Sequence, residues 1–243
     1  MAGNILVDHQ KVEKAGAMVD EDSVITVLKK DFPYVSRGAL KLLKALDAFQ
    51  VSPKGKRCMD IGASTGGFTE VLLERGATSV AAVDVGYNQL AWKLREDPRV
   101  IVMEKTNGRN LTPDAFGGQL FDLIVTDVSF ISLEKILQAS WECLEESGEM
   151  IALIKPQFEA GKGEVSRKGI VTDPKTHQKV IRRITFFAVE EVGFSALSLE
   201  RSPLKGPKGN VEFLLHLRKD GQRLQGISED VIHEVVMEER NDA

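Results

Sequence analysis

The sequence predicts an α/β fold built on a doubly wound, mostly parallel sheet. From Arg57 onward, short β-rich runs alternate with amphipathic stretches of helical period. The β-rich runs are almost continuously apolar, which is typical of parallel strands buried on both faces. Glycines and charged residues gather where several of these runs end, and open α/β sheets bind their ligands at that edge.

Seven strands are expected, at residues 58–62, 79–84, 100–104, 121–127, 148–155, 194–200 and 211–218. Helical patterns cover residues 68–76, 88–97, 132–146 and 174–191, and a tail helix is expected from about Ser228 to Glu239. Only the loop RSPLKGPKGN separates the last two strands. No crossover helix fits there, so the final strand is predicted to run antiparallel to its neighbour.

The first 28 residues have a different pattern, with short β runs separated by turn signals. They are too few to form a core alone. We therefore expect an appendage at residues 1–28, a linker at 29–35 and one large domain at 36–243.

The composition is that of a soluble globular protein, with 42% apolar and 28% charged residues in a chain of 243. No apolar run is long enough for a membrane helix, and the N-terminus does not have the pattern of a secretory signal. Cys58 and Cys143 are expected to be buried free thiols in a reducing cytoplasm. The four histidines are scattered without ligand spacing, so no metal site is expected.

The net charge of −4 conceals two basic segments. Residues 29–57 hold eight basic groups against two acidic ones, and residues 155–183 hold eight against three. A local basic face attracts a phosphate backbone whatever the total charge of the chain. Solvated helix faces explain either segment equally well when it is considered alone.

Four charged residues that are far apart in the chain are predicted to meet at one edge of the sheet. Asp127 ends the run FDLIVTD and Lys155 ends MIALIK, while Glu212 opens the antiparallel run VEFLLHL. Lys41, on a helix that enters the domain, can fold over that edge. Two amines and two carboxylates around one cleft suit a reaction that must deprotonate a hydroxyl. Taken singly, a helix-capping Asp or a solvated Lys remains the more common role.

The segment CMDIGASTGGFTEVLL predicts a strand-to-helix turn that a ligand can approach closely. Its spacing matches neither the dinucleotide G-x-G-x-x-G pattern nor a P-loop. Asp84 ends the next strand, where a carboxylate can accept both hydroxyls of a ribose. Asp60 disfavours a pyrophosphate and favours the cationic amino acid end of S-adenosylmethionine. NAD and a plain tight turn are the alternatives.

Five ordered blocks, YVSRGALKL, DIGASTGGFTE, DVSFISL, IKPQFE and GNVEFLL, resemble the TlyA family of hemolysin A-like proteins. This family is similar to FtsJ-type ribosomal RNA 2′-O-methyltransferases. The resemblance spans nearly the whole chain and implies a seven-stranded Rossmann-like S-adenosylmethionine methyltransferase fold. It also implies a catalytic tetrad of Lys41, Asp127, Lys155 and Glu212, with Lys155 as our candidate base.

The glycine-rich turn and the basic segments, together with the resemblance, predict two further groups of residues. The cofactor S-adenosyl-L-methionine is expected at Asp60, Gly62, Ser64, Gly66, Gly67, Phe68 and Asp84. Ribosomal RNA or a ribosomal subunit is the expected partner, with contacts from Arg37, Lys44, Lys162, Arg167 and Lys168. Phe130 or Phe158 could stack on a splayed base, although a core role is favoured for both.

Two departures from the family pattern stand out. Position 39 is alanine where the family block reads SRGG, and residues 1–28 match only the C-terminal part of the family's αL RNA-binding domain. Three other functions compete with RNA methylation: a small-molecule methyltransferase, a membrane-lysing protein and a catalytically silent RNA-binding protein. The sequence has no strongly basic amphipathic helix of the kind that lyses membranes, and the tail helix is acidic.

Overall fold

The computed structural model describes residues 5–12, 17–27 and 32–238. The chain divides into two compact units, Met1–Tyr34 and Val35–Ala243. Residues 28–31, which include the first three residues of the expected linker and the basic residues Lys29 and Lys30, lie outside the described residues. Val35 belongs to the second unit, where its N–H donates to the Glu70 carboxylate at 2.6 Å.

The first unit contains a three-stranded antiparallel sheet in the order β2-β1-β3. Its strands are β1 (Ile5–Val7), β2 (Gln10–Lys11) and β3 (Ile25–Val27). The turn between β1 and β2 places Asp8 and His9 in the left-handed region. The Asp8 carboxylate accepts a hydrogen bond from the Val24 N–H at 2.9 Å, which fastens the turn to the approach of β3.

The second unit contains the predicted seven-stranded sheet, in the order β6-β5-β4-β7-β8-β10-β9. Its strands are β4 (Arg57–Ile61), β5 (Ser79–Val83), β6 (Val100–Met103), β7 (Phe121–Thr126), β8 (Leu144–Ile154), β9 (Ser195–Arg201) and β10 (Phe213–Arg218). Strands β4 to β8 pair in parallel, while β10 lies antiparallel between β8 and β9. The expected fold class and the reversed final strand are both confirmed.

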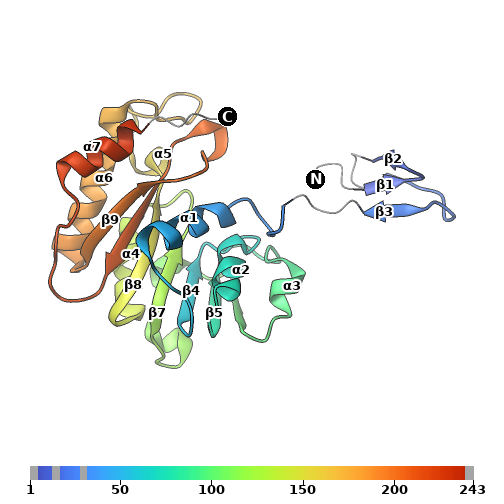
Figure 1. The fold of residues 1–243 in the computed structure, drawn as a ribbon, viewed down its shortest axis with the longest axis horizontal. Coiled ribbons are helices and arrows are strands. Elements are labelled where there is room, and N and C mark those ends of the chain that lie inside the picture. The colour runs from blue at the N-terminus through green and yellow to red at the C-terminus, as the bar shows by residue number, and fades with distance from the viewer. Residues whose placement is uncertain (1–4, 13–16, 28–31, 239–243) are drawn as a thin grey trace. The chain divides into compact units, whose positions relative to one another are not determined.

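Helices cover both faces of this sheet (Figure 1). On one face lie α1 (Ala39–Phe49) and α2 (Gly67–Glu74), which contact each other and bury Leu42, Leu46, Val71 and Leu72. The other face packs into one large core with α4 (Glu134–Cys143), α6 (Pro174–Phe186), the π-helical segment η3 (Phe187–Val192) and α7 (Glu229–Met237). Shorter pieces are α3 (Trp92–Arg95), α5 (Pro156–Glu159), η1 (Gly108–Asn110), η2 (Pro113–Phe116) and η4 (Pro207–Gly209).

Helix α6 begins where its sequence predicts. The Asp173 carboxylate accepts hydrogen bonds from the N–H groups of Lys175 at 3.2 Å and Thr176 at 3.1 Å. Pro174 occupies the first helical position, where a missing N–H costs nothing. The last turn of the expected helix 174–191 forms η3 instead, and Gly193 ends it in the left-handed region.

Two expected helices are shorter than predicted. Only Trp92–Arg95 of the segment 88–97 is helical. The pattern 132–146 ends at Cys143, because Leu144 is fully buried and pairs with Phe121 as the start of β8. The Lys219 ammonium donates to the carbonyls of Trp141 and Leu144, which satisfies the end of α4. Sheet pairing therefore overrides helical periodicity there.

Among the residues that the structure describes, no helix has the length and apolar character needed to cross a membrane. Cys58 and Cys143 are buried free thiols, as expected. The tail helix ends at Met237, and Glu239 lies outside the described residues.

Candidate active site

The four charged residues expected to converge do so at one edge of the sheet. Asp127 directly follows β7, Lys155 directly follows β8, and Glu212 directly precedes β10. Because β10 runs antiparallel to β8, its first residues lie beside the last residues of β8, with Phe213 opposite Ile154. Lys41 reaches the same place from α1, which packs on β9 and β10.

Ion pairs connect the four side chains in a row. The Lys41 ammonium lies 2.7 Å from Glu212 Oε2 and 3.5 Å from Asp127 Oδ2. The other oxygen of Asp127 lies 2.5 Å from the Lys155 Nζ. Asp127 therefore bridges the two amines, and Glu212 pairs with Lys41 at one end of the row.

Two neutral side chains complete this network. Lys155 Nζ donates to Ser129 Oγ at 2.9 Å, and Gln157 Nε2 donates to Glu212 Oε1 at 3.1 Å. Neither Ser129 nor Gln157 was singled out from the sequence. Ser129 lies two residues after Asp127, and Gln157 lies two residues after Lys155. This spacing from the quartet (Lys41, Asp127, Lys155 and Glu212) is the sequence feature that could have predicted them.

The quartet is largely withdrawn from solvent. Lys41 and Lys155 are each 8% exposed and Glu212 is 1% exposed. Burial lowers the pKa of the Lys41 amine, but the charges and hydrogen bonds of Asp127 and Glu212 outweigh it, so the pKa lies above its ordinary 10.5. Lys41 therefore stays a fixed cation at neutral pH. Ala39, the position that departs from the family block, is buried and is the first residue of α1.

The glycine-rich turn between β4 and α2 packs against the quartet. Gly62 and Gly66 have φ angles of +87° and +97°, which side chains rarely adopt. A Cβ on Gly62 would lie 2.8 Å from the Asp127 carbonyl oxygen, and one on Gly67 would collide with the Ser36 hydroxyl. The turn thus needs glycine where it approaches the edge of the sheet that holds the four charged residues.

Asp60 has one oxygen bound and one free. Oδ2 accepts from the Thr69 N–H at 2.9 Å and from its hydroxyl at 2.7 Å, which anchors α2. Oδ1 is buried without a hydrogen-bond partner among the described residues. Burial raises the Asp60 pKa to about 7, since the hydrogen bonds from Thr69 offset only part of the desolvation. An ammonium group of a ligand would satisfy this orphaned oxygen.

Asp84 follows β5 and is held by backbone donors. Oδ2 accepts from the Ser64 N–H at 2.8 Å and Oδ1 from the Gly86 N–H at 2.7 Å. These bonds fix the carboxylate at the rim of a cavity of about 760 Å³, which Asn107 and Gly108 also line. Each oxygen keeps a lone pair that a ribose hydroxyl can use.

A second cavity of about 270 Å³ connects the turn to the quartet. Its lining includes Asp60, Ser64, Gly67, Phe68, Lys41, Asp127 and Lys155. Both cavities share Gly62, Ser64, Asp127 and Ser129. A ligand with a ribose at Asp84 and an amino acid at Asp60 would therefore have its centre beside Asp127. The residues present fit S-adenosylmethionine.

The five candidate RNA contacts differ in their surroundings. Arg37, Lys162, Arg167 and Lys168 are exposed, and the last three lie on the loop between α5 and α6. Lys44 is instead partly buried and forms an ion pair with Glu200 at 3.0 Å. RNA would have to compete with Glu200 for Lys44.

The preference for a core role is wrong for Phe130. Its side chain is 89% exposed, its backbone lies in the left-handed region at φ 64°, and it lines the larger cavity. Its ring centroid lies 4.8 Å from that of Phe158, which is partly buried. The segment after Asp127 leaves the sheet, so Phe130 points away from the core that apolarity alone predicts for it.

Within residues 5–12, 17–27 and 32–238, no cluster of three or more histidine, cysteine, aspartate or glutamate side chains could hold a metal ion.

Known proteins are similar to this chain in both sequence and fold. A family model described as FtsJ-like methyltransferase matches residues 34–219. A relative from Mycobacterium tuberculosis named 16S/23S rRNA (cytidine-2′-O)-methyltransferase TlyA is 46% identical over 240 residues, covering 98% of this chain and 89% of the relative. A Brachyspira hyodysenteriae protein named Hemolysin A is 42% identical over 217 residues, covering 89% of each chain.

Solved structures agree with this assignment. A protein from Streptococcus thermophilus described as a hemolysin matches with a TM-score of 0.82 and 45% identity, covering 97% of this chain and 86% of that one. A Listeria monocytogenes protein described as an S-adenosylmethionine-dependent methyltransferase matches at 16% identity with a TM-score of 0.54, which shows a shared fold alone. The chain belongs to the FtsJ-like methyltransferase family and groups there with the TlyA proteins. The resemblance drawn from the sequence blocks is confirmed, and the protein is a methyltransferase.

Proposed function

We propose that this protein methylates the 2′-hydroxyl of a ribose in ribosomal RNA, with S-adenosylmethionine as the methyl donor. The observation that carries the proposal is the row Glu212–Lys41–Asp127–Lys155 beside a cavity that the glycine-rich turn also lines. The target nucleoside is a cytidine in our proposal, as in the name of the Mycobacterium tuberculosis relative.

The chain supplies a place for each part of the cofactor. Asp84 would hold the ribose, Asp60 Oδ1 would accept from the ammonium, and the turn Gly62–Gly67 would lie along the chain between them. Phe68, buried against the same cavity, would close its floor. When bound, S-adenosylmethionine supplies an electrophilic methyl group on a sulfonium. The protein's own contribution is to hold the attacking oxygen in line with that group.

The quartet divides the acid–base work between its two lysines. Lys41 is held between two carboxylates and keeps its proton, so it can orient the ribose and offset developing negative charge. Lys155, held by Asp127 and Ser129, would accept the 2′-hydroxyl proton on Nζ. A general base must be neutral when it accepts a proton, so the proposed step requires Lys155 to give up its own proton before the oxygen attacks.

RNA would approach over exposed basic residues near this edge. Arg37, Lys162, Arg167 and Lys168 are the proposed phosphate contacts, with Lys44 available once its pair with Glu200 opens. Phe130, exposed beside Ser129, would stack on the displaced base. Both features favour a macromolecular substrate over a small molecule enclosed beneath a lid.

Lys155→Ala tests the proposal. Methylation of ribosomal subunits purified from cells that lack the gene should fall by at least ~100-fold, because general-base catalysis contributes that much or more. S-adenosylmethionine affinity should stay near that of the wild type, and Lys54→Ala, on an exposed turn, is the matched control. Mass spectrometry of ribosomal RNA digests locates the methyl group. A Lys155→Ala protein that still methylates near the wild-type rate would show that another group takes the proton.

A further inference from the structure

Two short basic turns lie side by side at the edge of the sheet that holds the quartet. The proposed reaction does not require the two turns to act together. The first, Ser166–Ile170, is closed by hydrogen bonds from the Gly169 N–H to the Ser166 carbonyl at 2.8 Å and from the Ser166 N–H to the Ile170 carbonyl at 3.0 Å. The second, residues 205–210, is closed by the Gly206 N–H, which donates to the Asn210 carbonyl at 2.8 Å. Each turn is therefore a compact unit.

The Asn210 side chain joins the two turns. Its Nδ2 donates to the Gly169 carbonyl at 3.0 Å, and its Oδ1 accepts from the Val171 N–H at 3.0 Å. The amide thus pairs with two backbone groups of the first turn, as a neighbouring strand would. Asn210 is only 3% exposed, so these bonds are shielded from competing water.

The joined turns are anchored to the rest of the domain. The Val171 carbonyl lies 3.0 Å from Nε2 of the buried His177 on α6. On the other side, the Ser202 N–H donates to the Glu212 backbone carbonyl at 2.9 Å. A Cβ on Gly206 would collide with the Glu212 carboxylate, so the second turn lies directly over a member of the quartet.

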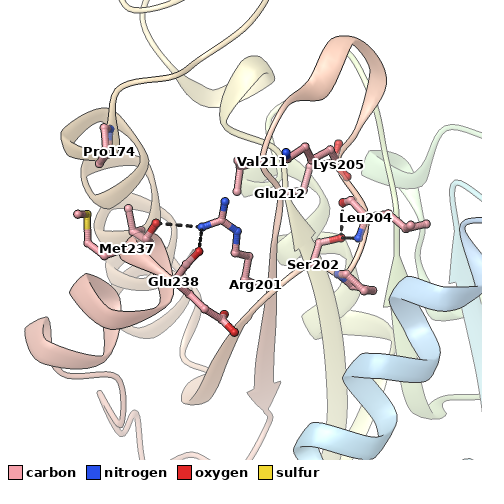
Figure 2. Close-up of a pocket in the computed structure, with 11 residues that line it drawn as sticks. Pro174, Arg201, Ser202, Leu204, Lys205, Val211, Glu212, Met237 and Glu238 are labelled. Atoms are coloured by element: carbon pink, nitrogen blue, oxygen red, sulfur yellow. Dashed lines mark hydrogen bonds between the residues drawn. The ribbon is translucent and has the colours of Figure 1, made fainter. Parts of the chain in front are cut away.

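The two turns carry positive charge only. Residues 166–170 and 205–210 contain no acidic residue, and their basic residues are Arg167, Lys168, Lys205 and Lys208. Lys208 Nζ lies 3.5 Å from the point where a Cβ on Gly169 would sit, so the tips of the turns are adjacent. Figure 2 shows Arg201 and Lys205 around a neighbouring cavity of about 450 Å³, which the acidic Glu212 and Glu238 also line. The Arg201 guanidinium donates there to the Val236 and Glu238 carbonyls, so the positive charge of the surface comes from the lysines and arginine of the two turns. Such a surface attracts phosphate groups.

We propose that Asn210 is a positioning residue that joins these turns into one binding surface for the RNA phosphates flanking the target ribose. The inference rests on the proposed RNA methylation. Held together by Asn210, the turns meet the RNA already ordered, so less conformational entropy is lost on binding.

Asn210→Ala, and Asn210→Asp as a near-isosteric second variant, test this role. The aspartate keeps an acceptor for Val171 but loses the donor to Gly169. Both variants should raise the KM for ribosomal subunits about tenfold or more and change kcat by less than about threefold, since uniform binding is what they lose. S-adenosylmethionine affinity should be unchanged, which also reports an intact fold. A fall in kcat with unchanged KM would overturn the inference.

A double-mutant cycle separates joint action from mere structural support. Lys168→Ala and Lys208→Ala should each raise the KM, and their combined effect should differ from the product of the two. In the Asn210→Ala protein, Lys168→Ala should raise the KM by a much smaller factor than it does in the wild-type protein. Equal effects of Lys168→Ala in both proteins would overturn the inference. If the Asn210 variants fail to fold, independent Lys168 and Lys208 effects in the wild-type chain would overturn it instead.

The outcome is distinguishable from failure of the proposed function. A wild-type protein that methylates no ribosomal RNA would refute that function, whatever the Asn210 variants do. Filter binding of transcribed ribosomal RNA across a KCl series then still tests the surface. Loss of one phosphate contact should reduce the salt slope by about 0.7–0.9, whereas Lys54→Ala should leave the slope unchanged.

Discussion

The two carboxylate oxygens of Asp60 have different surroundings. One oxygen anchors α2 through Thr69, while the other is buried without a partner among the described residues. An unpaired buried carboxylate oxygen destabilises the ionised form. The fold keeps this arrangement at the cavity where the proposed cofactor's ammonium would lie.

Asp60→Asn should therefore flatten the pH dependence of stability. With a folded pKa of about 7 against 3.8 in the unfolded chain, the native state holds the extra proton between these values, so stability falls as pH rises through this window. The upper limit of this loss is about 4 kcal/mol, at 1.36 kcal/mol per unit. Urea unfolding at pH 5.5 and pH 8 should show a smaller drop for Asp60→Asn than for the wild type. Parallel pH dependences of the two proteins would contradict the assignment.

At the scale of elements, one partly buried cluster links the end of α1 to strands β8 and β10. Glu149 on β8 lies 3.1 Å from His216 Nε2 on β10 and 2.6 Å from Lys56 Nζ before β4. The Phe49 ring at the end of α1 stacks on His216 at 5.3 Å. The hydrogen bond from His216, together with Lys56, lowers the Glu149 pKa to about 2.

Glu149→Gln should destabilise the protein at neutral pH by about 1–3 kcal/mol, the usual range for a charged, partly buried hydrogen bond. The folded pKa lies below the ordinary 4.5, so this contribution is present above pH 4.5 and is lost as pH falls toward 2. Urea unfolding at pH 7 and pH 3 should show the difference shrinking at the lower pH. Glu146→Gln, 84% exposed in its pair with Lys219, is the control and should change stability by less than about 1 kcal/mol. A constant difference at both pH values would argue against the ion pair.

Contacts between elements explain why the sequence pattern predicts some helix ends at the wrong residue. The run 132–146 has helical periodicity throughout, but Leu144 gains a strand partner in Phe121 and complete burial. Local periodicity carries no information on which neighbour a residue will meet. Element types were therefore predicted well and their ends less well.

At the scale of the whole molecule, the second compact unit contains the entire quartet and both cavities beside it. A chain of residues 35–243 should bind S-adenosylmethionine as tightly as the full chain and unfold at nearly the same temperature. Isothermal titration and calorimetry of the two chains check this. Loss of cofactor binding in the shorter chain would show that the site needs residues 1–34. Weaker RNA binding by the same chain would show that the first unit, which resembles part of the family's αL RNA-binding domain, contributes to RNA binding.

The sequence by itself determined the sheet, the reversed last strand and the residues that meet at its edge. Near-continuous apolar runs are typical of strands buried on both faces of a sheet, and the residues that end parallel strands share one edge. Asp127, Lys155 and Glu212 were placed by this reasoning alone. Lys41 depended on family resemblance, because nothing local in α1 shows which way a helix will pack.

Only the tertiary structure decided how the side chains at that edge are connected. It placed Lys41 between Glu212 and Asp127, exposed Phe130, and joined two basic turns through Asn210. Each of these results depends on contacts between segments remote in the chain. Residue type and spacing indicate what chemistry a group can perform, whereas its hydrogen-bond partners and burial are set by packing.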